Sequence, residues 1–293
     1  MLGAPDARSP RSPVGAPVSE SSPTPVEPKP AASVVLVREA TLGSPEPLEV
    51  YMIRRNRSMK FLGGYYAFPG GKVDPADGSP AALARCRGVE TAEAEVIFPG
   101  HEGAPALAFW VTAVRELLEE SGVLLGCDEA GRALDPATPH IREAIERCRK
   151  ALMAGEPFAT LIAREGWYCD LRPLRYLSHF ITPISSPIRF TARFFVGPIP
   201  PGQEPRLFTE ETSEGFWIHP GEGYRRFLSG EMKMAEPAEY GLAYLAQFTS
   251  LDDLWAAHDD GRPKFHGIVD RIHVFWEKFD WKQNRFPSLG PEK

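Results

Sequence analysis

The stretch VRELLEESG at residues 114–122 constrains the fold most, because it has to form a helix that is both buried and charged. Apolar residues recur at helical spacing from residue 107 to residue 118, so one face of this helix packs on a core. Glu116 and Glu120 lie one turn apart with Glu119 beside them, which places all three carboxylates on another face. Gly122 follows the last apolar positions and predicts the C-cap of the helix.

Three neighbouring carboxylates on one helix face repel each other, at about 0.2–0.5 kcal/mol per pair on an exposed helix. Taken alone, such a cluster is more typical of a solvated face than of a binding site. The alternative is that the glutamates hold a divalent cation, because Mg2+ prefers hard oxygen ligands and is usually shared with substrate phosphates. The helix by itself leaves both interpretations open.

A second stretch, AFPGGKVDPAD at residues 67–77, favours the metal interpretation. Gly70 and Gly71 allow the backbone to turn sharply after Pro69 and to approach a ligand closely. A carbonyl exposed at such a turn is a suitable extra ligand for a hard cation. On its own, however, a PGG sequence is typical of ordinary turns.

Together the two stretches resemble the signature of the Nudix hydrolase family. That signature is Gly, five residues, Glu, seven residues, then R-E-U-x-E-E-x-G-U, where U is aliphatic. Residues 115–123, RELLEESGV, match the second half throughout. The first half begins at Gly71, and Asp77 stands where the family has Glu.

The signature is interrupted here, because residues 78–114 separate Asp77 from Arg115 where the family has seven residues. Residues 78–106 have little pattern and are interpreted as an insertion, which chain entropy tolerates because closure cost grows only logarithmically with length. This arrangement resembles the long-insert branch of the family, which includes peroxisomal coenzyme A diphosphatases. The segment ITPISSPIRFTARFFVGPIP is also similar to that branch, with Phe180 and Thr191 in place of Trp and Asp.

The resemblance implies hydrolysis of a nucleoside diphosphate derivative by attack of water on phosphorus. It implies that Mg2+ or Mn2+ is bound by Glu116, Glu119, Glu120 and the Gly70 carbonyl, with Gly71 and Asp77 in support. Arg115 would orient a glutamate, and Asp77 would pair with it. Among the distant acidic residues Glu210, Glu211 and Glu214, we prefer Glu214 as a ligand or base.

Phosphate groups also need cationic partners. The candidates are basic residues near the two motifs: Arg54, Arg55, Lys60, Lys72, Arg189 and Arg193. The segment RRNRSMKFLGGYYAFPGG partly resembles the upstream signature of coenzyme A diphosphatases. Arg55, Gly64 and FPGG match that signature, whereas Asn56 and Lys60 differ from it. The preferred substrate is therefore coenzyme A or an acyl-coenzyme A.

The order of predicted elements indicates an α+β chain, and the resemblance implies a Nudix-type α/β/α sandwich with a mixed sheet. Residues 1–30 are rich in proline and are expected to be a disordered tail. The Nudix hydrolase domain is expected over residues 31–220, with the insertion at 78–106. Residues 221–293 are expected to form a C-terminal helical extension packed on the same domain.

The net charge and the distribution of apolar residues limit the possible binding partners and the expected location. The formal net charge of −6 argues against a nucleic-acid-binding protein. No apolar run is long enough to span a bilayer, and the first residues lack the apolar core of a secretory signal, so the expected location is the cytoplasm. The expected partner is a small nucleoside diphosphate derivative, and a homodimer is an open alternative. Hydrolysis of ADP-ribose, NADH or a nucleotide sugar, and a non-catalytic nucleotide-binding or regulatory module, also stay open.

Overall fold

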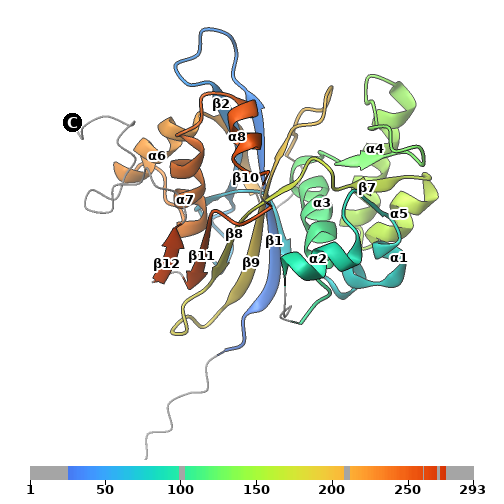
Figure 1. Ribbon diagram of the computed structural model, residues 1–293, viewed down its shortest axis with the longest axis horizontal. Helices are drawn as coiled ribbons and strands as arrows, with labels where there is room; N and C mark the ends of the chain where they lie inside the picture. The colour runs from blue at the N-terminus through green and yellow to red at the C-terminus, as the bar shows by residue number, and fades with distance from the viewer. Residues whose placement is uncertain (1–25, 99–102, 208–211, 260, 269–270, 275–293) are drawn as a thin grey trace, which may run out of the picture.

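The computed structural model describes residues 26–98, 103–207, 212–259, 261–268 and 271–274 (Figure 1). Residues 1–25 of the expected tail lie outside these ranges, as does the aromatic stretch from residue 275 onward. The first strand, β1 (Lys29–Glu39), begins before the expected end of the tail at residue 30. The reason for the earlier start is pairing, since Lys29 and Pro30 lie opposite Phe190 and Thr191 in the sheet.

A large mixed sheet runs through the middle of the molecule (Figure 1). Its central path has the order β10-β2-β1-β9-β8-β11-β12, with β3 paired to β2 and β4 paired to β1. The pairing of β1 with β2 is antiparallel, whereas β1 and β9 are parallel. The strands after β1 are β2 (Leu48–Arg55), β3 (Tyr66–Ala67), β4 (Gly70–Lys72), β8 (Arg175–Ile181), β9 (Phe190–Pro198), β10 (Thr212–Ile218), β11 (Phe265–Ile268) and β12 (Arg271–Val274).

Helices cover both faces of this sheet (Figure 1). Strand β1 is buried on both sides because its side chains alternate: Val34 and Leu36 join one hydrophobic cluster, and Val35 and Val37 join the other. The first cluster is covered by η1 (Pro75–Gly78), α1 (Pro80–Leu83), α2 (Thr91–Ile97), α3 (Ala108–Ser121), α4 (Pro139–Met153) and α5 (Phe158–Arg164). The second is covered by α6 (Pro220–Leu228), α7 (Glu236–Leu245) and α8 (Leu251–Ala256). The predicted α+β class, with a mixed sheet and extra C-terminal helices, is confirmed.

The glutamate helix α3 ends as predicted, with Gly122 at φ 73° in the left-handed region and its N–H donating to Leu118 O (2.9 Å). The next strand after α3 is β6 (Gly126–Cys127). It pairs with β7 (Tyr168–Asp170), and β5 (Cys86–Arg87) pairs with the other edge of β7 to form a separate small sheet.

The insertion at residues 78–106 is more ordered than its low sequence pattern indicates. It contains α1, β5 and α2. Gly88, with φ 99°, separates β5 from α2, and an added Cβ there would lie 2.8 Å from Arg172 N. Phe98 at the end of α2 is buried and stacks on Trp110 of α3, with ring centroids 4.6 Å apart. The insertion thus packs on the glutamate helix.

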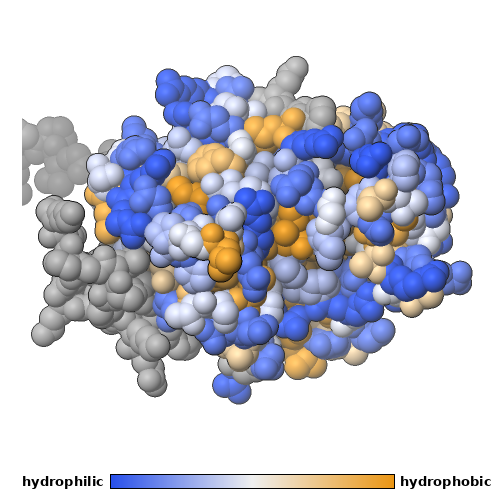
Figure 2. All heavy atoms as spheres, turned by 90° about the horizontal axis from the view of Figure 1, so that it is seen from above, coloured by the Kyte–Doolittle hydropathy of each residue, from blue (hydrophilic) through white to orange (hydrophobic). Residues whose placement is uncertain are grey.

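The face of the molecule seen in Figure 2 is mostly hydrophilic, with apolar side chains in scattered groups. Among the helices that the structure describes, none has the length and apolar character needed to cross a membrane.

Candidate active site

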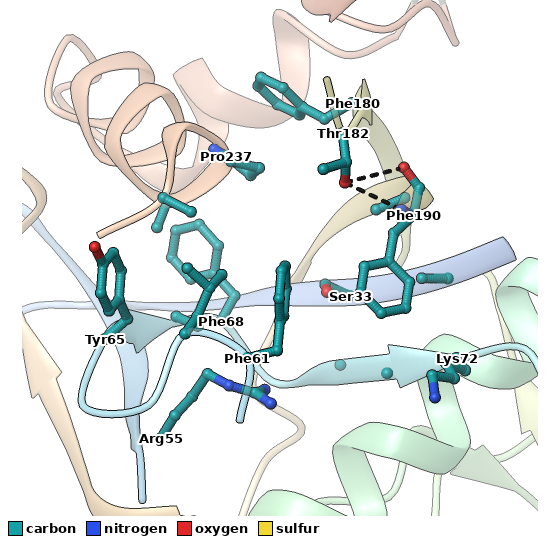
Figure 3. A pocket seen from close by; sticks show the side chains of 18 of the residues that line it. Ser33, Arg55, Phe61, Tyr65, Phe68, Lys72, Phe180, Thr182, Phe190 and Pro237 are labelled. Atoms are coloured by element: carbon teal, nitrogen blue, oxygen red, sulfur yellow. Dashed lines mark hydrogen bonds between the residues drawn. The ribbon is translucent and has the colours of Figure 1, made fainter. Parts of the chain in front are cut away.

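A pocket of about 1040 Å³ lies where β4 and the last turns of α3 meet the sheet. One wall is charged and contains Glu116, Glu119, Glu120 and Lys72, together with the glycines of β4. Most of the rest is apolar and includes several aromatic rings, and Figure 3 shows the Phe61 ring standing in the pocket between Phe68 and Phe190. The two motifs predicted from the sequence are therefore brought to one cavity.

Asp77 and Arg115 join the two halves of the interrupted signature. Arg115 Nε donates to Asp77 Oδ1 (2.9 Å), and Arg115 Nη2 donates to Asp77 Oδ2 (2.9 Å). Asp77 also accepts from Thr112 Oγ1 (2.8 Å) and from the backbone N–H of Asp74 (3.0 Å). Its side chain is only 2% exposed, so a fully hydrogen-bonded buried ion pair holds η1 against α3.

Arg115 also holds two of the glutamates. Its Nη1 donates to Glu116 Oε1 and to Glu119 Oε2, both at 2.9 Å, and its Nη2 donates to Lys72 O (2.8 Å). Burial alone lowers the pKa of Arg115, but the carboxylates of Glu116, Asp77 and Glu119 together raise it above its ordinary value. Burial raises the pKa of Glu116 to about 7, against the lowering effect of Arg115. Arg115 thus orients two carboxylates, as the resemblance implies.

The glycines of β4 leave room for the other carboxylates. The N–H of Gly70 donates to Glu120 Oε2 (2.7 Å). A Cβ added at Gly71 would meet Glu116 Oε1 and Oε2, which shows how closely β4 and α3 approach. Glycine is needed at this position because any side chain would displace Glu116.

Metal binding by these groups stays a prediction. Within the described ranges, no three His, Cys, Asp or Glu side chains are arranged as a ready metal cluster. Arg115 lies between Glu116 and Glu119 and donates to both. The donor set nevertheless suits a hard cation, because three carboxylates and the backbone of Gly70 line one cavity.

Two of the predicted phosphate-binding residues, Arg55 and Lys72, line the pocket. The Nε of Arg55 is buried without a hydrogen-bond partner, and Figure 3 shows this side chain below Phe61. Arg54 and Lys60 do not line the pocket. Arg54 lies over the ring of Tyr66 (5.2 Å), and Lys60 is exposed.

Arg189 and Arg193 are not among the residues that line the cavity. Arg189 donates from Nε to Thr182 O (3.0 Å) and from Nη1 to Val26 O (2.7 Å), so it fixes backbone instead. Arg193 lies on the opposite face of β9, with its guanidinium 4.5 Å from the centroid of the Phe98 ring. Neither arginine is among the pocket-lining residues, so their positions give no support to a role in this pocket. Along β9 the side chains alternate, so Ala192 and Phe194 face the pocket while Arg193 lies on the other face.

Glu214, the preferred distant acid, is also outside the cavity lining. It accepts from Arg54 Nη1 (2.8 Å) and is half exposed on β10. The other candidates, Glu210 and Glu211, lie outside the described residues. The predicted role of Glu214 in the pocket therefore finds no support in its position.

Several residues of the site were not predicted. Thr112 lies one turn before Arg115 and donates to Asp77, and a helical wheel could have indicated it. The aromatic wall, with Phe61, Tyr65 and Phe190, gave no signal because aromatic residues are equally typical of a core. Arg149 on α4, which donates to the carbonyl of Glu119, also had no motif to mark it.

Known proteins resemble this chain in sequence and in fold. A family model described as the NUDT19 Nudix domain matches residues 28–245. The acyl-coenzyme A diphosphatase NUDT19 of Gallus gallus is 29% identical, over 76% of this chain and 69% of its own. The protein of that name from Homo sapiens is 28% identical, over 76% of this chain and 70% of its own. The crystal structure of a Nudix hydrolase from Alicyclobacillus acidocaldarius has 30% identity and a TM-score of 0.63, covering 78% of this chain and 96% of that one.

Proposed function

Since the chain belongs to the NUDT19 Nudix domain family and is a Nudix hydrolase, we propose that it is a metal-dependent diphosphatase of coenzyme A or acyl-coenzyme A. The observation that carries the proposal is the shared cavity, in which Glu116, Glu119 and Glu120 face a space also lined by Arg55 and Lys72. The names of the relatives from Gallus gallus and Homo sapiens support the choice of substrate.

The chain's own residues supply binding and orientation. Lys72 and Arg55 offer positive charge to phosphate groups, and the buried Nε of Arg55 has a hydrogen bond left to donate. Arg115, held by Asp77, orients the carboxylates of Glu116 and Glu119, and the Gly70 N–H orients that of Glu120. These contacts are made before substrate arrives, which lowers the cost of ordering the site.

Glu116, Glu119, Glu120 and the Gly70 carbonyl would hold a divalent cation, Mg2+ or Mn2+. When bound, such a cation neutralises diphosphate charge and lowers the pKa of a coordinated water. The aromatic part of the cavity gives the remainder of a large substrate an apolar surface, since about 1040 Å³ exceeds what a diphosphate group needs.

The test is a panel of coenzyme A, acyl-coenzyme A, NADH, ADP-ribose and nucleotide sugars, each with Mg2+ or Mn2+, and with products identified by mass. We expect cleavage of the coenzyme A diphosphate, giving adenosine 3′,5′-bisphosphate and phosphopantetheine or its acylated form. Preference for another member of the panel would overturn the proposal that coenzyme A or an acyl-coenzyme A is the substrate. Ligand binding without any product would favour a non-catalytic module.

A further inference from the structure

Helix α4 carries a buried arginine, Arg149, that contacts the end of the glutamate helix. Its side chain donates from Nε (3.0 Å) and from Nη2 (2.8 Å) to the carbonyl oxygen of Glu119. Its Nη1 donates to Arg206 O (2.8 Å). Arg149 is 5% exposed, and burial lowers its pKa to about 10, so it is still a cation at neutral pH. A buried positive charge is thus placed directly behind the pocket.

The position of this contact has a physical reason. The last carbonyls of an α-helix have no amide of their own helix to accept from. At the end of α3, Leu118 O accepts from the N–H of Gly122 (2.9 Å), and Ser121 O accepts from the N–H of Arg206 (2.7 Å). The carbonyl of Glu119 instead receives the side chain of Arg149, whose charge also suits the negative end of the helix.

Gly122 lies beside the same contact and leaves room for it. Its φ of 73° is the left-handed conformation that favours glycine. A Cβ at Gly122 would also lie 2.6 Å from Arg149 Nη1, so any side chain would push the guanidinium away. The glycine of the Nudix signature therefore serves two needs in this chain: it ends α3 and it admits Arg149.

Glu119 is consequently held at both ends. Its carboxylate accepts from Arg115 Nη1 (2.9 Å) inside the pocket, and its carbonyl accepts from Arg149 behind it. We infer that Arg149 is a positioning residue for hydrolysis, because it fixes the last turn of α3 and thereby the directions in which Glu119 and Glu120 enter the pocket. This inference rests on the proposed function, and it gives α4 a role in the reaction that no sequence motif indicates.

The test compares Arg149→Gln and Arg149→Lys with Arg147→Gln, a matched control on the same helix. Arg147 is 60% exposed and pairs with Glu165 (3.4 Å), which is not part of the Arg149 network. We expect Arg149→Gln to lower kcat by about 10–100-fold, with KM changed less than about twofold, since outer-shell partners of ligands typically have effects of this size. Arg149→Lys should recover part of kcat, because a single ammonium can still donate to the Glu119 carbonyl.

Two readouts do not depend on turnover. Mn2+ binding measured by calorimetry without substrate should weaken by about 10–100-fold in Arg149→Gln. Hydrogen exchange should accelerate at the last turn of α3 in both Arg149 variants and stay unchanged in Arg147→Gln. If Arg149→Gln does not fold, Arg149→Lys is judged by the same measurements.

The inference is overturned if the Arg149 variants lose thermal stability while kcat, KM and Mn2+ binding match the wild type, since that describes a purely structural residue. It is also overturned if the effect falls on KM alone. A wild-type protein that binds Mn2+ but cleaves no member of the panel would overturn the proposed function alone. In that case Mn2+ binding and hydrogen exchange in the variants still decide the role of Arg149.

Discussion

Two glutamates on opposite sides of the sheet, Glu116 and Glu239, have similarly raised pKa values but different surroundings. Burial raises the pKa of Glu116 on α3 to about 7, and burial together with Glu236 raises the pKa of Glu239 on α7 to about 7. Glu116 accepts a hydrogen bond from Arg115 and lines the pocket. Glu239 is not among the pocket-lining residues, although Glu236, one turn before it, lines the pocket and adds repulsion.

The comparison teaches that a raised pKa does not by itself identify a functional carboxylate. Perturbed groups are common at active sites, but burial perturbs structural groups in the same direction. What distinguishes Glu116 is its connection through Arg115 to Asp77 and Glu119, all within one network. Substitutions in the two regions test that distinction.

Asp77→Ala should remove the most buried of the three carboxylates that pair with Arg115, and should lower the free energy of unfolding by about 3–5 kcal/mol, the usual cost of breaking a buried ion pair. Chemical denaturation of the variant and the wild type measures this change in the free energy of unfolding. The control is Glu222→Ala on the other layer, where the exposed ion pairs with Arg225 and Arg226 should contribute less than about 1 kcal/mol. Equal costs for the two variants would show that the Asp77 network is no more than an ordinary surface ion pair.

Glu116→Gln and Glu239→Gln apply one chemical change on the two sides of the sheet. We expect Glu116→Gln to reduce kcat/KM by at least about 100-fold, because it removes an anionic oxygen from the metal-binding and orienting group. Glu239→Gln should stay within about twofold of the wild type. Activity assays at saturating Mg2+ measure both, with circular dichroism to verify folding; similar losses in the two variants would contradict the distinction.

Glu239 should make stability depend on pH. A carboxyl whose pKa rises on folding, here from 4.5 to about 7, favours the folded state while it is protonated. Its contribution is therefore complete at low pH and is lost as the pH rises from about 4.5 to 7. At pH 8, Glu239→Gln should be more stable than the wild type by about 1–2 kcal/mol, and at pH 4 this advantage should disappear. Denaturation curves at both pH values measure it, and a pH-independent difference would disprove it.

Glu236→Gln should have the smallest effect. It removes the repulsion on Glu239 but leaves burial, which is the larger cause, in place. The pKa of Glu239 should fall only part of the way from about 7 toward its ordinary value, as followed by NMR titration of labelled glutamate carboxyls. A complete return of the Glu239 pKa to its ordinary value would mean that the charge of Glu236, and not burial, is the main cause of the raised pKa.

Much of the glutamate helix α3 was predictable because its determinants are local. The helical spacing of apolar residues, the shared face of the three glutamates and the glycine C-cap follow from helix geometry. The Nudix resemblance then predicted the family and the mixed sheet, and both are confirmed. The positions of the basic side chains were harder to predict. Arg55 and Lys72 line the pocket, while Arg193 is buried on the opposite face of its strand.

The sequence by itself determined that one helix would carry three carboxylates and that two glycines would allow close approach to them, because these depend on short-range periodicity and backbone freedom. Tertiary structure alone decided that Asp77 meets Arg115 across the insertion, that Arg149 holds the carbonyl of Glu119, and that Glu214 pairs with Arg54 outside the pocket. Alternation along a strand separates its residues into two faces, but packing decides which face meets the cavity.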